Sequence, residues 1–292
     1  MSTEGYAEFL KDMGHTVRAT AGVFWYNDFP HFYTCFPFHR IVDTQAVDVK
    51  GVLGNDGWAM RYPCAFHQGR KSYRLACAVQ NYGLQSLSGK ARNQTRRGLE
   101  QCHVRPLLFA ELEVHGIPLN RETLVRQGRR IPNGFEDYWR RYYRAAARAD
   151  GACSWGAFVG DRLGAYLIAF DMERVMHVLI VRSSTEHLKS YPNNALLFEF
   201  LRFSLNQGGC LEVSIGLESI RKDLTSLDHF KEGMGFSQVE IGQRVELAPR
   251  LALLFRPAVC RVILWAAPAW KHGEKLDKLA GLLDWYRDQP CR

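Results

Sequence analysis

Apolar and polar positions divide the chain most clearly between Gly151 and Phe236. Three apolar runs there are separated only by short polar turns, so they predict three neighbouring antiparallel strands. A helical run follows, in which leucines recur at four-residue spacing, as one buried face of a helix requires. A short strand, a second helix and a further strand come next. These elements are the strands Cys153 to Val159, Ala165 to Phe170 and Val175 to Val181, the helix Leu196 to Asn206, the strand Leu211 to Ile215, the helix Leu224 to Lys231 and a strand from Phe236.

The residues that open the first of these helices predict a site for an anion. Pro192 suits the first turn of a helix, where its missing backbone donor costs nothing. Free N–H groups and the helix dipole at that end attract phosphate. We therefore expect the amides of Asn193, Asn194 and Ala195 to point outward toward a ligand. We also expect the substitution Ala195→Asp to keep the fold while weakening the binding of that ligand.

The rest of the chain alternates between strand-like and helix-like stretches. The helix from Ser86 to Gln101 is rich in basic residues, and Arg92 and Arg96 share one of its faces. Aromatic residues crowd the strands between Val17 and Ile41, where we expect them to form core rather than a surface that stacks on bases or sugars. The other predicted elements are a helix over residues 5–13, strands Val17 to Trp25, Phe32 to Ile41, Trp58 to Phe66, Ser72 to Val79 and His103 to Leu112, a loop from Gly51 to Gly57, and helices Asn120 to Arg126, Phe135 to Ala147 and Lys271 to Arg287.

Helix-breaking residues from Ile131 to Gly134 form the clearest linker. We therefore expect an N-terminal α/β domain over residues 1–130, a second domain over 133–248, and a C-terminal segment over 249–292 that packs on the core. From Pro249 to Trp270 the chain is strongly apolar but is interrupted by arginines and prolines. That stretch could cap the core, or it could lie in a membrane interface with its arginines snorkelling.

Composition narrows the classes of protein that need to be considered. The 292 residues, 47% of them hydrophobic and 23% charged, are typical of a globular protein. The net charge of +8 suits an anionic partner, although many enzymes are mildly basic for no dedicated reason. None of the eight cysteines forms a C-x-x-C pair, so no structural zinc is expected. No Walker loop, G-x-G-x-x-G or G-x-S-x-G motif is present. The first residues lack a signal pattern, and we expect a cytoplasmic protein that could be peripheral at the inner face of the membrane.

The order of elements from residue 133 to 248 resembles the acyl-CoA-binding half of GNAT-type N-acyltransferases. It resembles more closely the Fem-type aminoacyltransferases, whose GNAT-like fold is doubled. Three blocks carry the resemblance: Gly160 to Tyr166, Tyr191 to Leu196, and Phe230 to Phe236. The glycine-containing pyrophosphate loop of ordinary GNAT enzymes is absent. The resemblance implies an α+β fold, with a mixed sheet flanked by helices and two tandem GNAT-like halves.

The resemblance also implies a reaction. An acyl group would pass from an acyl-CoA thioester, acetyl or longer, to an amine of a small molecule or cell-envelope precursor, without a metal. A backbone N–H near Leu179 or Val181 would polarise the thioester carbonyl. Two alternatives stay open. Aminoacyl-tRNA could be the donor, with basic segments serving its phosphates, or the chain could be a binding module that has lost the chemistry.

Candidate side chains for this reaction come from four segments. Glu218 and His229 are the candidate acid and base, because both follow the second strand of the predicted crossover. Lys231 is expected to contact a phosphate or carboxylate. The basic helix, through Arg92 and Arg96, would hold an anionic substrate. The resemblance places the helix that carries Trp139 and Tyr142 over the acceptor groove, although both could equally be core residues.

Overall fold

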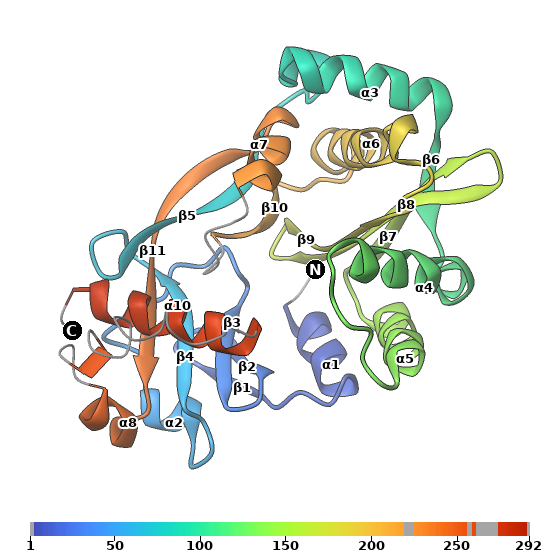
Figure 1. Cartoon of the computed structure of the whole chain (residues 1–292). Coiled ribbons are helices and arrows are strands. Elements are labelled where there is room, and N and C mark those ends of the chain that lie inside the picture. Colours follow the sequence, from blue (N-terminus) through green and yellow to red (C-terminus); the bar gives the residue numbers. More distant parts are fainter. Residues whose placement is uncertain (1–2, 219–224, 256–258, 261–273, 291–292) are drawn as a thin grey trace. The chain divides into compact units, whose positions relative to one another are not determined.

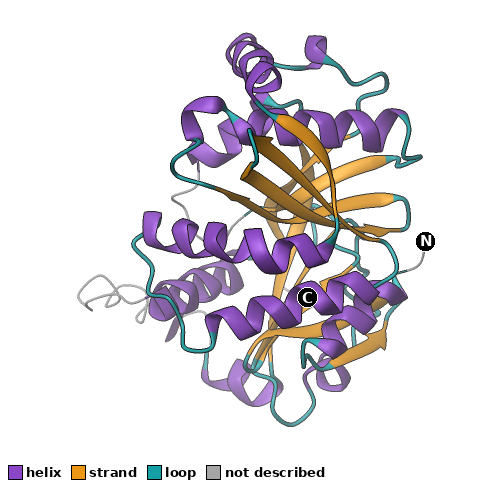
Figure 2. Ribbon diagram, turned by 90° about the vertical axis from the view of Figure 1, so that its right-hand side faces the viewer, coloured by secondary structure: helices purple, strands orange, loops and turns teal. Residues whose placement is uncertain are grey.

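The computed structural model describes residues 3–218, 225–255, 259–260 and 274–290. The apolar stretch expected to cap the core or meet a membrane lies partly outside these residues, as does the start of the helix predicted from Leu224. Helices flank strands that pair both parallel and antiparallel, so the predicted α+β class with a mixed sheet is confirmed (Figure 2).

The described chain forms two compact units that interleave along the sequence. Unit 1 comprises Met1–Gly14, Leu75–Gly216 and Ser226–Ser237. Unit 2 comprises the remainder, namely His15–Arg74, Leu217–Thr225 and Gln238–Arg292. The division predicted at residues 130 and 248 stays a prediction about how the chain is built from halves.

Unit 1 has a layer of helices on each face of its strands. The strands follow the order β10-β9-β8-β7-β6, with β9 and β10 parallel and the other pairs antiparallel. Helix α6 packs on one face beneath α3, whereas α4 and α5 pack on the other with α1 beside α5 (Figure 1). The elements are α1 (Glu4–Asp12), α3 (Gly89–Gln101), β6 (His103–Leu107), α4 (Phe109–Arg126), α5 (Phe135–Arg148), β7 (Ala152–Val159), β8 (Arg162–Met172), β9 (Val175–Ser183), α6 (Pro192–Asn206), β10 (Glu212–Leu217) and α7 (Thr225–Gly233), with the 3-10 turns η1 (Leu84–Ser86) and η2 (Leu188–Ser190).

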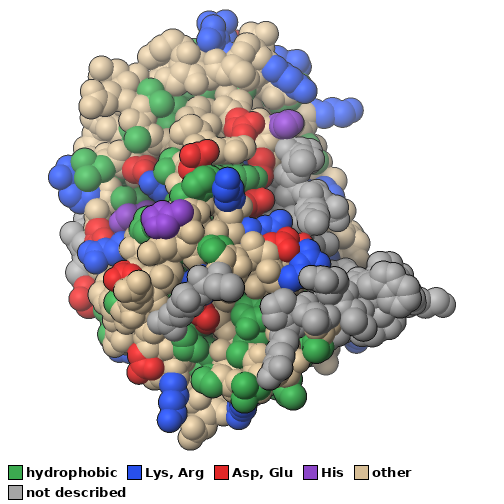
Figure 3. Space-filling view, turned by 90° about the vertical axis from the view of Figure 1, so that its left-hand side faces the viewer, with side chains coloured by type: hydrophobic (Ala, Val, Ile, Leu, Met, Phe, Trp, Pro, Cys, Tyr) green, Lys and Arg blue, Asp and Glu red, His purple; other side chains and the backbone are tan. Residues whose placement is uncertain are grey.

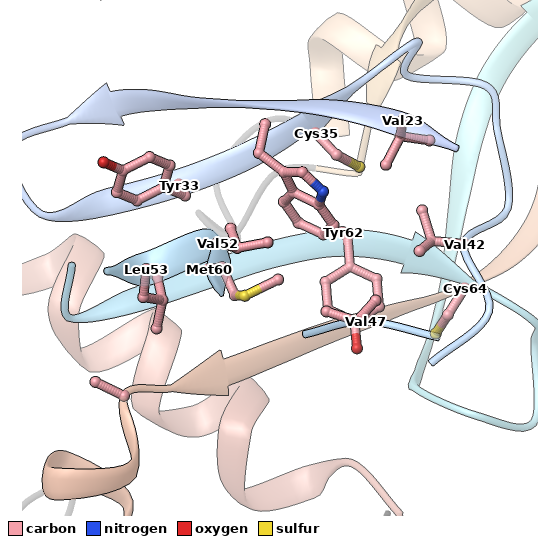
Figure 4. Close-up of a cluster of buried hydrophobic side chains, with 12 residues drawn as sticks. Val23, Tyr33, Cys35, Val42, Val47, Val52, Leu53, Met60, Tyr62 and Cys64 are labelled. Atoms are coloured by element: carbon pink, nitrogen blue, oxygen red, sulfur yellow. The ribbon is translucent and has the colours of Figure 1, made fainter. Parts of the chain in front are cut away.

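Unit 2 is built around a second set of strands, in the order β1-β2-β3-β4-β11-β5. Trp25, Met60 and Tyr62 lie in a buried cluster on one face, where Val52 of α2 also points inward (Figure 4). On the other face Val245 and Trp285 belong to a second buried cluster. The elements are β1 (Val17–Thr20), β2 (Val23–Phe29), β3 (Phe32–Phe36), α2 (Val49–Leu53), β4 (Ala59–Cys64), β5 (Arg70–Cys77), β11 (Ser237–Leu247), α8 (Pro249–Leu254) and α10 (Glu274–Asp288).

The same succession of elements occurs in both units. In unit 1, β7, β8 and β9 pair antiparallel, α6 follows, and β10 pairs parallel to β9. In unit 2, β1, β2 and β3 pair antiparallel, α2 follows, and β4 pairs parallel to β3. The tandem GNAT-like halves are therefore confirmed, although no repeat is visible in residue identity.

Four local predictions are wrong. The strand expected from His103 to Leu112 ends at Leu107, because α4 begins at Phe109 and runs through Pro118 to Arg126. The carboxylate of Glu111 accepts the Leu108 amide proton at 2.9 Å, which caps the start of that helix.

The other three errors fall in unit 2. The strand expected from Phe32 to Ile41 ends at Phe36. The expected loop from Gly51 to Gly57 contains the end of α2. The single strand expected from Val17 to Trp25 is two strands, because Ala21 and Gly22 adopt positive φ angles of 55° and 72° and turn the chain into a hairpin.

Candidate active site

Strand β9 extends beyond its partner β10. Registered pairs between the two strands end at His177 and Ser214, whereas β9 continues to Ser183. On the β8 side the register shifts, since Ile168 pairs with Ile180 but Ala169 pairs with Val178. Leu179 is therefore the extra residue of a β-bulge, a feature common next to active sites. Backbone groups of β9 beyond Val178 thus have no β10 partner, as an extended ligand would require.

Arg126, at the end of α4, ties down the chain that leaves β9. Its Nη1 donates to the Ser183 carbonyl oxygen at 3.2 Å and to Thr185 Oγ1 at 3.0 Å. The Thr185 amide in turn donates to a carboxylate oxygen of Glu122 at 2.7 Å. The Asn193 side chain donates to Ser183 Oγ at 3.2 Å, which links the start of α6 to the end of β9. One arginine therefore fixes the turn between the unpaired strand edge and the helix.

The amides at the start of α6 differ from the prediction. Tyr191 adopts a left-handed conformation with φ of 52°, and its carbonyl oxygen accepts from the amides of Asn194 at 3.1 Å and Ala195 at 3.2 Å. Pro192 has no amide proton, so among the described residues only the Asn193 amide of this turn is left for a ligand. The expectation that all three amides point outward is wrong for Asn194 and Ala195.

Helix α3 packs directly against this turn. A Cβ atom on Gly98 would lie 2.8 Å from the Tyr191 carbonyl oxygen and 3.2 Å from the Ala195 Cβ atom. Ala195 is fully buried. An aspartate there would bury a charge in a packed interface, so the expectation that Ala195→Asp keeps the fold is not supported by the structure.

A polar atom beside the free amide also lacks a partner. Asn193 Oδ1 is buried and accepts no hydrogen bond from any described residue. Buried oxygens without a donor are uncommon in folded proteins, and water or a ligand usually satisfies them. The Asn193 side chain is thus the part of the predicted anion site that the structure leaves open, and its oxygen is suited to a donor rather than to a phosphate.

On the opposite face of β9, Arg182 lies against a buried aromatic cluster. Its guanidinium carbon is 5.9 Å from the centre of the Trp139 ring, and Trp139 in turn packs on Tyr142 at 5.3 Å. Both rings are buried. Trp139 and Tyr142 therefore pack as core residues beneath Arg182, and their predicted contact with an acceptor stays a proposal.

A closed ring of three hydrogen bonds lies next to this cluster. Asn120 Nδ2 donates to the Tyr143 hydroxyl at 2.7 Å, the two tyrosine hydroxyls of Tyr143 and Tyr166 are 3.0 Å apart, and the Tyr166 hydroxyl donates to Asn120 Oδ1 at 2.5 Å. Burial raises the pKa of Tyr143 to about 12 and that of Tyr166 well above its ordinary value. All three side chains stay neutral and satisfy one another.

The arginines of α3 have separate roles. Arg92 donates to the carbonyl oxygens of Leu84 and Leu87 at 2.9 and 3.0 Å, so it stabilises the turn before the helix. Arg97 lies 5.0 Å from the centre of the Tyr191 ring. Arg96 is exposed. A substrate contact through Arg92 or Arg96 is untested, and Arg97 is the α3 arginine that reaches the α6 turn.

The predicted residues of α7 are on the surface or paired. His229 is exposed. Lys231 Nζ lies 3.1 Å from Asp228 Oδ1, and both side chains are largely buried. The charge of Lys231 is therefore balanced within its own helix, which weakens its case as a phosphate ligand.

Glu218 belongs to a polar cluster of unit 2. Its Oε2 accepts the Ser72 hydroxyl proton at 2.7 Å, and its amide donates to the Tyr73 carbonyl oxygen at 2.8 Å. Gln243 Nε2 donates to Ser72 Oγ at 2.7 Å. A strand end holds Glu218, as the sequence predicts, but hydrogen bonds from unit 2 set its orientation.

Sequence analysis did not single out Arg126, Ser183 or the Asn193 side chain as a group. Arg126 appeared only as the end of a predicted helix, and a serine in a strand gives no signal by itself. Glu111 was an available clue to the start of α4.

The next features are the distribution of charge on the surface, the grouping of metal-ligating side chains and the apolar character of the helices. On the face drawn in Figure 3, basic side chains lie close to acidic ones rather than forming a separate patch. Within the described residues, no cluster of three or more metal-ligating side chains occurs. Among the helices of that same part of the chain, none is both long and apolar enough to cross a bilayer.

Comparison with known proteins supports the fold. No protein-family model matches the chain, and no curated protein sequence matches it. The structure of FemX aligns with a TM-score of 0.61 at 13% identity, covering 86% of this chain and 92% of FemX. The C-terminal domain of a protein assigned as a lysylphosphatidylglycerol synthetase from Agrobacterium fabrum aligns with a TM-score of 0.57 at 11% identity, over 89% and 91% of the two chains. The structure of L-PGS from Bacillus licheniformis aligns with a TM-score of 0.53 at 13% identity, covering 87% of this chain and 95% of L-PGS. The chain has a GNAT-like fold of the doubled, Fem-like kind.

Proposed function

We propose that this protein is an acyltransferase that moves an acyl group from an activated carrier to an amine. The observation that carries the proposal is the unpaired edge of β9 beyond His177, with its bulge at Leu179. A donor laid along this edge would form backbone hydrogen bonds like those of a strand. A β9 amide near Leu179 or Val181 would then donate to the carbonyl oxygen on which negative charge develops.

The bonds in the proposed step balance simply. The neutral amine attacks the acyl carbon, a C–N bond forms, and the bond from that carbon to the carrier's sulfur or oxygen breaks. One amine proton leaves to a base, and the released thiolate or alkoxide takes a proton. His229 and Glu218 remain the proposed acid–base groups. His229 is exposed and so can exchange protons with water.

Two donors fit this chemistry, and the α6 turn favours one of them. Acyl-CoA is the donor that the GNAT resemblance suggests, but its pyrophosphate would find only the Asn193 amide at this turn. Fem-type enzymes instead take an aminoacyl group from tRNA. The fold similarity to FemX and L-PGS, over 86% and 87% of this chain, favours that donor. We therefore place aminoacyl-tRNA first and acyl-CoA second, which reverses the order expected from sequence.

The acceptor in this proposal is an amine of a small molecule or an envelope precursor. Peripheral contact with a membrane through the segment 249–270 accompanies it. In the described part of that segment, Leu253 and Leu254 of α8 are 70% and 64% exposed, as an interfacial helix would require. Flotation with anionic vesicles tests this contact, with the substitution of both leucines by serine as the control.

Transfer assays separate the candidate functions. The protein is incubated with a panel of amines and one radiolabelled donor at a time. The donors are aminoacyl-tRNA, acetyl-CoA and a longer acyl-CoA. The proposal expects labelled product with aminoacyl-tRNA, in an amount that falls steeply as salt rises. Product only with acyl-CoA restores the thioester as donor. Binding of a donor without product from any amine supports a binding module and contradicts the acyltransferase.

A further inference from the structure

In unit 2, one half-buried arginine retains a buried donor atom. The Nε atom of Arg61 is buried and donates to no described residue. The guanidinium carbon lies 5.7 Å from the centre of the Trp285 ring. Arg70 shares the same ring at 4.9 Å but also pairs with Asp284 at 3.4 Å. Two arginines thus flank one tryptophan, and within the described residues Arg70 is the one that pairs with an acid.

A fully buried glutamine on the same side of the sheet lacks a hydrogen-bond donor, whereas Arg61 lacks an acceptor. Gln243 Nε2 donates to Ser72 Oγ at 2.7 Å and to the Glu218 carbonyl oxygen at 3.4 Å. These acceptors fix which end of the amide is nitrogen, because a carbonyl oxygen needs a donor. The remaining atom, Gln243 Oε1, is buried and accepts no hydrogen bond from any described residue.

Strand register places these two deficits close together. Val245 pairs with Arg61 across β11 and β4, and Gln243 pairs with Pro63. Because side chains two residues apart share a face, Gln243 and Val245 point to the same side as Arg61. Gln243 and Arg61 are then diagonal neighbours, which places their Cβ atoms roughly 7–8 Å apart in an antiparallel pair.

Glu218 completes the set. Its Oε2 is occupied by the Ser72 hydroxyl, whereas Oε1 has no hydrogen bond within the described residues. Its charge acts on Arg61 without a direct hydrogen bond between them. Burial lowers the pKa of Arg61, and the carboxylates of Asp28 and Glu218 oppose that change. Arg61 Nε, Gln243 Oε1 and Glu218 Oε1 therefore each retain hydrogen-bonding capacity that no described residue uses.

We propose that Arg61, Gln243 and Glu218 form a binding site for an amino-acid-like zwitterion. The ligand's carboxylate accepts from Arg61 Nε, and its ammonium group donates to Gln243 Oε1 and Glu218 Oε1. This assignment satisfies the unpartnered Arg61 and Gln243 atoms and uses charge-assisted hydrogen bonds at both ends. An isolated anion would leave Gln243 unsatisfied, and an isolated amine would leave Arg61 unsatisfied.

The site does not depend on the acyl transfer proposed for unit 1. Its residues all belong to unit 2, and ligand binding can be measured without a donor.

Calorimetric titration of the full chain with each of the proteinogenic amino acids tests the site. The tightest binder is then compared with its carboxamide and its N-acetyl derivative. In the unmodified protein, each derivative is expected to bind at least about tenfold more weakly, because each loses one charge-assisted contact. In Arg61→Met, the carboxamide and the parent amino acid should bind within about twofold of each other. In Glu218→Gln, the same should hold for the N-acetyl derivative.

Controls keep the result decisive. Arg250→Met removes an exposed arginine of α8 and should leave all the affinity ratios unchanged. Circular dichroism checks folding, and Glu218→Gln keeps the test open if Arg61→Met does not fold, since it preserves shape. No amino acid binding at about 10 mM, which is weaker than any useful affinity, overturns the proposal. Unchanged penalties in both variants, or equal binding of acetate or methylamine alone, overturn it as well.

Discussion

Strand β9 continues from its last pair with β10, at His177, to Ser183, whereas β3 continues from its last pair with β4, at Thr34, only to Phe36. The helices that follow differ as well. Helix α6 has 15 residues and no side-chain cap, and α2 has 5 residues and is capped by the Asp48 carboxylate.

The two units thus share one succession of elements but differ at the strand edge and at the start of the helix that follows. In unit 2 the helix start is occupied by a carboxylate of the protein itself, since Asp48 Oδ1 accepts the Gly51 amide proton at 3.0 Å. In unit 1 the strand edge and the Asn193 side chain are left open. The comparison shows that a repeated topology can leave a strand edge open in one copy and nearly close it in the other.

The polar networks buried inside the two units differ in the opposite direction. The ring formed by Asn120, Tyr143 and Tyr166 in unit 1 is neutral and satisfied. In unit 2, Arg61 and Gln243 each retain a buried atom that has no hydrogen-bond partner among the described residues. A satisfied network stabilises a core, whereas an unsatisfied one is costly unless a ligand completes it.

The largest loss of stability is expected from a substitution at the start of α6. Ala195→Asp should lower the free energy of unfolding by about 3 kcal/mol or more, because it buries an uncompensated charge against α3. Urea denaturation measures the loss. A folded Ala195→Asp protein of unchanged stability would mean that α3 does not cover this turn. Ala195→Ser, smaller and uncharged, is the matched control and should cost less.

Alkaline pH should weaken unit 1 through its hydroxyl ring. An unfolded tyrosine loses its proton near pH 10, whereas burial raises the pKa of Tyr143 to about 12. The unfolded state therefore binds fewer protons between these values, and stability is present below pH 10 and falls as pH rises toward 12. The loss from Tyr143 alone should approach about 2 kcal/mol. Denaturation curves of Tyr143→Phe across this range should be flatter, and an equal slope would contradict the buried ring.

Removing the arginine that holds the β9 turn should reduce transfer without unfolding the protein. Arg126→Ala is expected to lower kcat/KM at least about tenfold, because the strand edge and the start of α6 lose their shared anchor. Arg121→Ala, on the same helix but paired at the surface with Glu136, is the matched control. Equal activity of the two variants would show that the β9 turn does not position the reaction.

The smallest effect is expected in unit 2, at the start of α2. Asp48→Ala removes the cap of α2 and should cost about 1 kcal/mol, the usual value for an N-cap. Thermal melting measures this loss, and transfer activity should not change. A loss of activity larger than the loss of stability would assign a catalytic role to the start of α2.

Most of the fold could be predicted from sequence, because its strands and helices carry strong apolar periods. Strands β7, β8 and β9 and the helix after Pro192 are where the pattern places them. Helix α4 was predicted only over Asn120 to Arg126, because His103 to Leu112 was assigned to one strand. A proline such as Pro118 inside a helix removes one hydrogen bond, and this long packed helix tolerates that loss.

The site was harder to predict for a physical reason. An unpaired strand edge is a property of two strands and leaves no trace in the side chains of either one. The amides of Asn194 and Ala195 were expected to be free because sequence gives no sign that Tyr191 adopts a left-handed conformation. Arg126 and Ser183 are 57 positions apart in the chain, and only the fold brings them together.

The central claim is that the open edge of β9, and not its counterpart in unit 2, binds the acyl donor. Amide hydrogen exchange followed with a non-hydrolysable 3′-aminoacylamino-adenosine, and separately with a stable acyl-CoA analogue, tests it directly. The account predicts slower exchange at Val178 to Ser183 with a donor analogue and unchanged exchange at Cys35 and Phe36. Donor binding that protects β3, or that leaves Val178 to Ser183 unchanged, would contradict it.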